Sequence, residues 1–214
     1  MHLPHRAVDL LHRRRPSRRP RPAPQDITLG ARLPRAFYAR STLLVARDLL
    51  GRVLVYDDGG VRKAARLVEV EAYLGHLDPA SHAFRGPTPR TSVMFGKPGV
   101  AYVYYIYGNH HCMNVVAHVP GVAGAVLLRG ADPIAGFAEG TRVLAGPGLL
   151  GRGFGLTTAH TGLDLVRSAL HLRAGEPPAP RDIVRTTRIG IAASDTSASM
   201  WRFYIRGAKG VSRP

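Results

Sequence analysis

The chain has 214 residues and a formal net charge of +16. Hydrophobic residues make up 45% of it, which excludes a wholly disordered chain, and no stretch approaches the ~18 apolar residues of a membrane-spanning helix. The single cysteine, Cys112, excludes an internal disulfide framework and fits a reducing, intracellular compartment. What remains is a basic globular protein without a membrane span. Its charge favours a polyanionic partner, with nucleic acid ahead of an anionic membrane surface.

The first 31 residues differ from the rest in composition. Seven arginines and two aspartates lie there among several prolines, so residues 1–31 hold +5 of the charge and residues 32–214 hold +11. Like charges repel and prolines block regular structure, which predicts a disordered arm. The arm is either a tether for DNA or a dispensable extension. We therefore divide the chain into this arm, a domain over residues 32–206 and a C-terminal tail over 207–214.

The domain is predicted to be mixed α/β (α+β). A helix is predicted from Ser41 to Gly51, an N-cap and a C-terminal glycine, and residues 146–172 hold helical patches broken by Gly151, Gly153 and Gly155. Segments of apolar or alternating residues, bounded by turn residues, predict strands. They are residues 52–56, 65–73, 101–107, 112–118, 125–129, 188–191 and 202–205. The short connections between them indicate one domain around a mostly antiparallel sheet.

Two carboxylates share a face of the strand over residues 65–73. Period-two alternation sends Val68 and Val70 to the core, and places Glu69 and Glu71 on the opposite face, roughly 6.5–7 Å apart. Glu69 is interpreted as part of a solvated face. Glu71 lies at the strand end, beside Tyr73 and before the Gly-, Pro- and Ser-rich loop 75–99, where sites are usually built. A carboxylate beside an aromatic wall suits a general base for water.

Tyrosines crowd into the strand that follows this loop. By alternation Tyr102 and Tyr104 face one way, and Tyr105 and Tyr107 the other. Such rings either stack on nucleic-acid bases or fill a sheet core. Tyr107 precedes Gly108 and can project from a hairpin tip, a position from which a side chain can wedge into a base stack.

The histidines do not form a metal-binding pattern. His110, His111 and Cys112 are contiguous, so neighbouring side chains point to opposite faces of a strand, and no second close ligand pair is present. His82 alone is either a pocket donor or an ordinary loop histidine. The glycine-rich stretch 151–155 follows no strand and has no acidic residue placed for a ribose. We therefore predict neither a metal nor a cofactor.

A series of motifs in one order carries a more specific signal. They are Glu71-Ala72-Tyr73-Leu74-Gly75, Asp78-Pro79-Ala80-Ser81-His82, Thr88-Pro89-Arg90, Met94-Phe95-Gly96-Lys97-Pro98-Gly99, Tyr102-Val103-Tyr104, Ile106-Tyr107-Gly108, Cys112-Met113-Asn114-Val115, Ala125-Val126-Leu127-Leu128-Arg129, Ala145-Gly146-Pro147-Gly148, Arg188-Ile189-Gly190-Ile191 and Arg202-Phe203-Tyr204. Together they resemble the alkyladenine (3-methyladenine) DNA glycosylase family over roughly residues 33–206. That family excises alkylated purines from duplex DNA with one mixed domain, which has a curved sheet and a DNA-inserting hairpin.

The resemblance implies a role for each matched residue. Glu71 would activate the attacking water, and Arg129 would hold the water and this general base. The residues that would line the pocket and sandwich the flipped base are Tyr73, His82 and Tyr104. Asn114 would help to exclude normal guanine, and Tyr107 would fill the gap that the base leaves in the duplex. The sequence departs from the family at Leu149, where relatives carry a lysine, at 109–111 and at 192–199.

The chemistry of the residues agrees with these roles. A base must leave the stack before an enzyme can reach it, and an electron-poor alkylated purine can stack on tyrosines with cation–π character. No matched pocket residue is a lysine, the amine that strand-cleaving lyase chemistry needs. We expect a monomeric, monofunctional base excision repair enzyme associated with DNA, acting on alkylated or deaminated purines. The alternatives are a non-catalytic nucleic-acid binder of the same fold and a hydrolase of free nucleosides.

Overall fold

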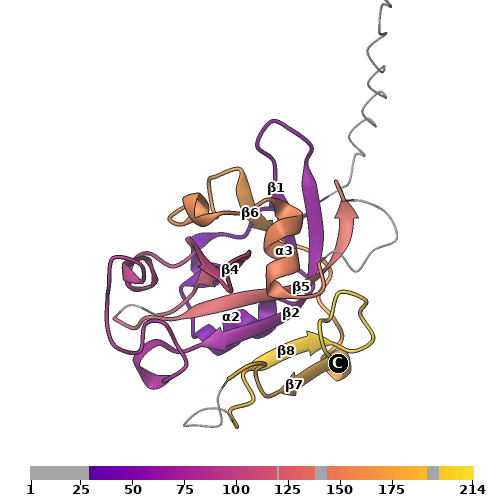
Figure 1. Cartoon of the computed structure of the whole chain (residues 1–214). Coiled ribbons are helices and arrows are strands. Elements are labelled where there is room, and N and C mark those ends of the chain that lie inside the picture. The colour runs from indigo at the N-terminus through magenta and orange to yellow at the C-terminus, as the bar shows by residue number, and fades with distance from the viewer. Residues whose placement is uncertain (1–28, 120, 138–143, 192–197) are drawn as a thin grey trace, which may run out of the picture.

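The computed structural model describes residues 29–119, 121–137, 144–191 and 198–214 (Figure 1). Most of the predicted arm and of the segment 192–199 lies outside these ranges. The helices are α1 (Arg35–Tyr38), α2 (Thr42–Leu49) and α3 (Pro147–Phe154). The strands are β1 (Val53–Tyr56), β2 (Lys63–Tyr73), β3 (Ala101–Ile106), β4 (His110–Val116), β5 (Ala125–Ala135), β6 (Leu170–Arg173), β7 (Ile183–Thr186) and β8 (Arg202–Ile205).

These eight strands of the described chain form one antiparallel sheet, curled like half of a barrel. Its order is β3-β4-β5-β2-β1-β6, and β8 joins β2 on one side and β7 on the other. Figure 1 shows β7 and β8 side by side, with the C-terminus next to them. The predicted single mixed domain with a mostly antiparallel sheet is thereby confirmed.

The long strand β2 is the centre of the sheet. Its first half pairs with β1, and its second half pairs with β8 through Glu69, Val70 and Glu71, while β5 pairs along its other side. Val68, Val70 and Ala72 are buried as the alternation predicts. The register of β2 against β5 shifts on both sides of Glu69, next to Arg129. Such irregularities re-aim side chains, here at the place where the site is built.

The helices cover this sheet with apolar side chains. The α2 helix follows Ser41 as predicted and packs against β2 and β5. The α3 helix packs against β4 and β5, and it runs without interruption through Gly151 and Gly153, so these two predicted breaks are wrong, whereas the helix ends at Gly155 as predicted. A Cβ at Gly151 would lie 1.9 Å from the His111 carbonyl oxygen. Close packing of the helix on β4 therefore requires glycine there and outweighs its low helix propensity.

Two further predictions differ from the structure. Residues 188–191 are not a strand; β7 ends at Thr186, because Arg188 turns inward to pair with the buried Asp78. The strand β6, which pairs with β1, was not predicted. Within the described residues no helix combines the length and the apolar character needed to cross a membrane.

Candidate active site

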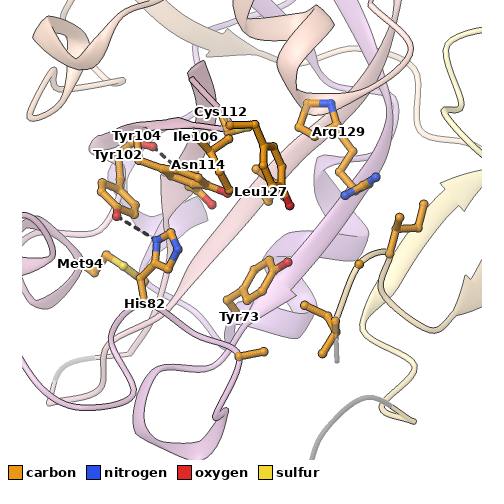
Figure 2. A pocket seen from close by; sticks show the side chains of 16 residues that line it. Tyr73, His82, Met94, Tyr102, Tyr104, Ile106, Cys112, Asn114, Leu127 and Arg129 are labelled. Carbon is orange, nitrogen blue, oxygen red and sulfur yellow. Dashed lines mark hydrogen bonds between the residues drawn. The ribbon is translucent and has the colours of Figure 1, made fainter. Parts of the chain in front are cut away.

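A cavity of about 260 Å³ opens where the end of β2, the loop 75–99, the β3–β4 hairpin and residues 189–191 meet (Figure 2). This volume is at the small end of ligand pockets, ~300–1,000 Å³, and suits one small aromatic ligand. Its polar and aromatic lining comprises Tyr73, His82, Tyr102, Tyr104, Tyr107, Cys112, Asn114 and Arg129. Six of the seven residues predicted for the site are in this group; Glu71 is the exception.

Tyr102, Tyr104 and Tyr105 divide as their alternation predicts, but Tyr107, which follows the end of β3, does not: it lines the same cavity as Tyr102 and Tyr104. The Tyr102 and Tyr104 rings both face the pocket, with centroids 5.6 Å apart. Tyr105 lies on the other face, against the His111 ring. Burial raises the pKa of Tyr104, and burial together with the Glu71 charge raises that of Tyr73. Both phenols are therefore neutral hydrogen-bond donors under ordinary conditions.

His82 is held in the pocket wall by hydrogen bonds and ring contacts. Its Nδ1 lies 3.0 Å from the Tyr102 hydroxyl, and its ring centroid is 4.6 Å from that of Tyr104. Arg90 donates to the same Tyr102 hydroxyl at 3.1 Å and approaches the His82 ring. Partial burial and the Arg90 cation lower the pKa of His82 to about 4. His82 is thus a neutral imidazole at physiological pH.

Glu71 lies directly behind the pocket wall and is fully buried. One carboxylate oxygen accepts the Tyr73 hydroxyl at 2.9 Å and lies 3.3 Å from Arg129 Nη1, and the other accepts the Ile189 amide at 2.8 Å. All three of these neighbours line the cavity, and in Figure 2 the Arg129 guanidinium points towards the hydroxyl end of Tyr73. The arrangement supplies hydrogen bonds to an anion and places that anion beside the pocket.

Glu69 is not part of a solvated face, and that interpretation is wrong. Its side chain is fully buried and accepts Arg129 Nε at 2.9 Å and Arg202 Nε at 2.8 Å. The reason is that β8 and the C-terminal residues cover this face of β2. No local sequence pattern predicts this contact. Arg129 consequently lies between two carboxylates, and despite the cost of burial Glu71 and Glu69 raise its pKa.

A second buried ion pair supports the other side of Tyr73. Arg188 donates two hydrogen bonds to Asp78, at 2.6 and 2.9 Å, and both side chains are fully buried. The Arg188 guanidinium lies 4.6 Å from the centroid of the Tyr73 ring and 5.0 Å from that of Trp201. Tyr73 is therefore fixed by a cation against its ring and by Glu71 at its hydroxyl.

The remaining two predicted residues take different positions. Asn114 is buried, and its Nδ2 donates to the Tyr102 carbonyl at 3.1 Å, which fixes the amide at the pocket. Tyr107 lies at the tip of the β3–β4 hairpin with 83% of its surface exposed. Among the described residues it is the only non-glycine with a positive φ, 53°. An exposed aromatic ring held in a strained conformation is typical of a functional position.

The sequence analysis missed several supporting groups. Arg90, Asp78 and Arg188 were considered only as motif residues, and Ser212 was assigned to a tail. Their roles depend on contacts that are made in the fold. For Arg90, Asp78 and Arg188 the only sequence signal was therefore their presence in the ordered motifs that carry the family resemblance. In the part of the chain that the structure describes, no three His, Cys, Asp or Glu side chains gather in a way that could hold a metal.

A buried, hydrogen-bonded carboxylate beside an aromatic cavity is the arrangement with which a hydrolytic enzyme can activate water next to a flat aromatic group. The family model of the methylpurine-DNA glycosylases matches residues 36–209. Relatives named "Putative 3-methyladenine DNA glycosylase" are 49% identical over 85% of this chain and 93% of theirs in Myxococcus xanthus, and 53% identical over 86% and 87% in Anaeromyxobacter dehalogenans strain 2CP-C. The chain belongs to the methylpurine-DNA glycosylase family, which confirms the predicted resemblance and enzyme class.

Proposed function

We propose that the protein takes an alkylated or deaminated purine, flipped out of duplex DNA, into this pocket and hydrolyses its N-glycosidic bond, leaving an abasic site. The observation that carries the proposal is Glu71, a buried carboxylate whose hydrogen-bond partners Tyr73 and Arg129 both line an aromatic cavity. The cavity has the size for one base and no more. The family and the relatives' names support the same substrate class.

The catalytic step requires a base and a stabilised leaving group. Glu71 accepts a proton from water as the water oxygen attacks C1′, and the carboxylate also stabilises the oxocarbenium character of the transition state. Arg129 holds Glu71 and the water in place. The bond between C1′ and the purine nitrogen breaks, and the electron pair leaves with the base. A purine alkylated at N3 or N7 already carries positive charge, so the departure of such a base needs little acid catalysis.

The other pocket residues select the substrate. Tyr73, His82 and Tyr104 sandwich the flipped base, and the neutral His82 ring avoids repulsion of a cationic purine. Asn114, fixed by the Tyr102 carbonyl, crowds the exocyclic amino group that distinguishes guanine. Tyr107 enters the gap in the duplex and offsets the few kcal/mol of unstacking. The residues lining the cavity include no lysine, so we propose a monofunctional enzyme. We also propose that it acts as a monomer.

The test uses two duplex oligonucleotides, one with a single hypoxanthine and one with a single 1,N6-ethenoadenine, each treated with alkali after incubation. Wild type and a Glu176→Gln control, which changes an exposed carboxylate, should release both bases. Glu71→Gln should be slower by about 10²–10⁴-fold, the range for a lost general base. Full activity of Glu71→Gln contradicts the assignment of the base, and a borohydride-trapped adduct contradicts the monofunctional mechanism. Tight binding without base release by wild type favours the non-catalytic binder.

A further inference from the structure

The mechanism above makes no use of Glu69, although this buried carboxylate accepts four hydrogen bonds next to the site. Besides Arg129 and Arg202, Glu69 accepts the backbone N–H of Ser212 at 2.6 Å and the Ser212 hydroxyl at 2.9 Å. Burial alone would raise the pKa of Glu69, but the Ser212 amide, Arg129, the Ser212 hydroxyl and Arg202 together lower it. Glu69 is therefore a fixed anion with no opening to the cavity.

The residues that hold Glu69 come from the end of the chain. The backbone N–H of Gly210 donates to Asp132 Oδ1 at 2.7 Å, Val211 is buried, and Arg202 donates to the Arg213 carbonyl. A Cβ on Gly210 would lie 2.3 Å from the Ala131 carbonyl oxygen, so this segment is packed tightly on β5. Residues 210–213 are thus docked beside the site, although the sequence placed them in a tail.

The contacts of Arg129 connect this C-terminal segment to the general base. Its Nε donates to Glu69, its Nη2 lies 3.4 Å from the Ser212 hydroxyl, and its Nη1 lies 3.3 Å from Glu71. A guanidinium is a rigid planar fork, so the direction of one edge determines that of the others. The shortest of the three contacts is the one to Glu69, at 2.9 Å, and together with Ser212 on the opposite terminal nitrogen it sets the plane of the group. Nη1 then meets Glu71 through a single contact that is 0.4 Å longer than the contact of Nε with Glu69.

We propose that Glu69 and Ser212 are positioning residues for the glycosylase reaction: they hold the Arg129 guanidinium so that it supports Glu71 without engaging it in a tight bidentate pair. The inference rests on the proposed function of Glu71. Without Glu69, Arg129 is free to turn both of its terminal nitrogens to Glu71, and bidentate pairs of this kind are the strong ones. A carboxylate so engaged is a poorer acceptor for the proton of water.

The pH dependence of the reaction separates positioning from mere structural support. The charged and titratable groups around Glu71 are Glu69 and Tyr73 from β2, Arg129 from β5, Arg202 from β8, Arg188 from the segment after β7, and Tyr104 and Cys112 from β3 and β4. Glu69→Gln removes one negative charge from this set, and with it the carboxylate that holds Arg129 and Arg202. The ionised form of Glu71 is then favoured, and the acid limb of the rate profile moves to lower pH while the plateau rate falls.

The variants are Glu69→Gln, Ser212→Ala and Ser212→Thr, with Glu176→Gln as the matched control. Single-turnover excision is measured over about pH 4 to 8 on the lesion duplex. Glu69→Gln should lower the plateau at least about tenfold and move the acid limb down, and Ser212→Ala should do the same to a smaller extent. Ser212→Thr, which keeps the hydroxyl, should restore the wild-type profile. A lower plateau with an unmoved acid limb, or an unchanged rate, overturns the proposal.

A second measurement does not depend on activity. The chain has four glutamates, Glu69, Glu71, Glu139 and Glu176, so carboxyl-labelled protein gives a simple carbon NMR spectrum in which Glu71→Gln assigns the Glu71 signal. The midpoint of this signal should fall in Glu69→Gln and stay in place in Glu176→Gln. If wild type releases no base, the proposed function fails, and the NMR titration still decides the coupling of Glu69 to Glu71. An unmoved Glu71 signal in a folded Glu69→Gln protein refutes that coupling.

Discussion

The buried pair of Asp78 and Arg188 gives a prediction whose size follows from burial. Both side chains have no exposed surface, and the two hydrogen bonds between them are 2.6 and 2.9 Å long. Asp78→Asn keeps the shape and removes the charge that faces the buried Arg188 guanidinium. Breaking such a pair costs roughly 3–5 kcal/mol of unfolding free energy. In a domain of this length the melting temperature should fall by about 6–20 °C.

The chain contains a matched control for this prediction. Arg40 and Asp48 are joined at a comparable 2.8 Å, but each side chain is 35% exposed. Asp48→Asn should therefore cost less than about 1 kcal/mol. The assay is urea unfolding at pH 7, with the free energy taken by linear extrapolation and the slope compared between variants.

The same substitution also affects the site, because Arg188 lies against the Tyr73 ring and precedes the Ile189 amide that binds Glu71. Asp78→Asn should slow excision at temperatures where the domain is still folded. If Asp78→Asn and Asp48→Asn destabilise the protein equally, burial does not govern the strength of this pair and the reasoning is wrong.

Three other changes test different parts of the structure. The pKa of His82 is about 4 in the folded protein and 6.5 in a free chain, so on acidification the unfolded state binds the extra proton first. The free energy of unfolding should therefore fall as the pH drops from about 6.5 to 4. In His82→Gln this decline, measured by urea midpoints, should be smaller. Tyr107→Gly should alter stability by less than about 1 kcal/mol, because glycine accepts the positive φ, yet slow excision from duplex more than from single-stranded DNA. Gly151→Ala should destabilise by about 1–3 kcal/mol in the same unfolding assay, because its Cβ meets the His111 carbonyl; a helix glycine in open space would instead gain about 0.5–1 kcal/mol.

Local patterns were sufficient for the parts of the protein that depend on neighbours in the chain. The alternation in β2 placed Val68 and Val70 in the core, and the alternation in β3 separated Tyr102 and Tyr104 from Tyr105. These predictions held because successive side chains of a strand point to opposite faces whatever surrounds the sheet. The ordered motifs identified the family and, with it, six residues that the fold brings to one cavity.

Tertiary contacts decided what local patterns could not. The local sequence predicts a solvated Glu69, but β8 and Ser212 cover it in the structure. It also predicts a helix break at Gly151, where the packing of α3 on β4 requires a glycine. The direction in which Arg188 points depends on Asp78, 110 residues earlier in the sequence. The sequence by itself predicted which side chains carry the chemistry, through their types and their order. Contacts between distant segments decided the burial of these side chains, their ionic partners and the plane of the Arg129 guanidinium. The reason is that the cost of burying a charge depends on whether an opposite charge or a hydrogen-bond partner lies beside it.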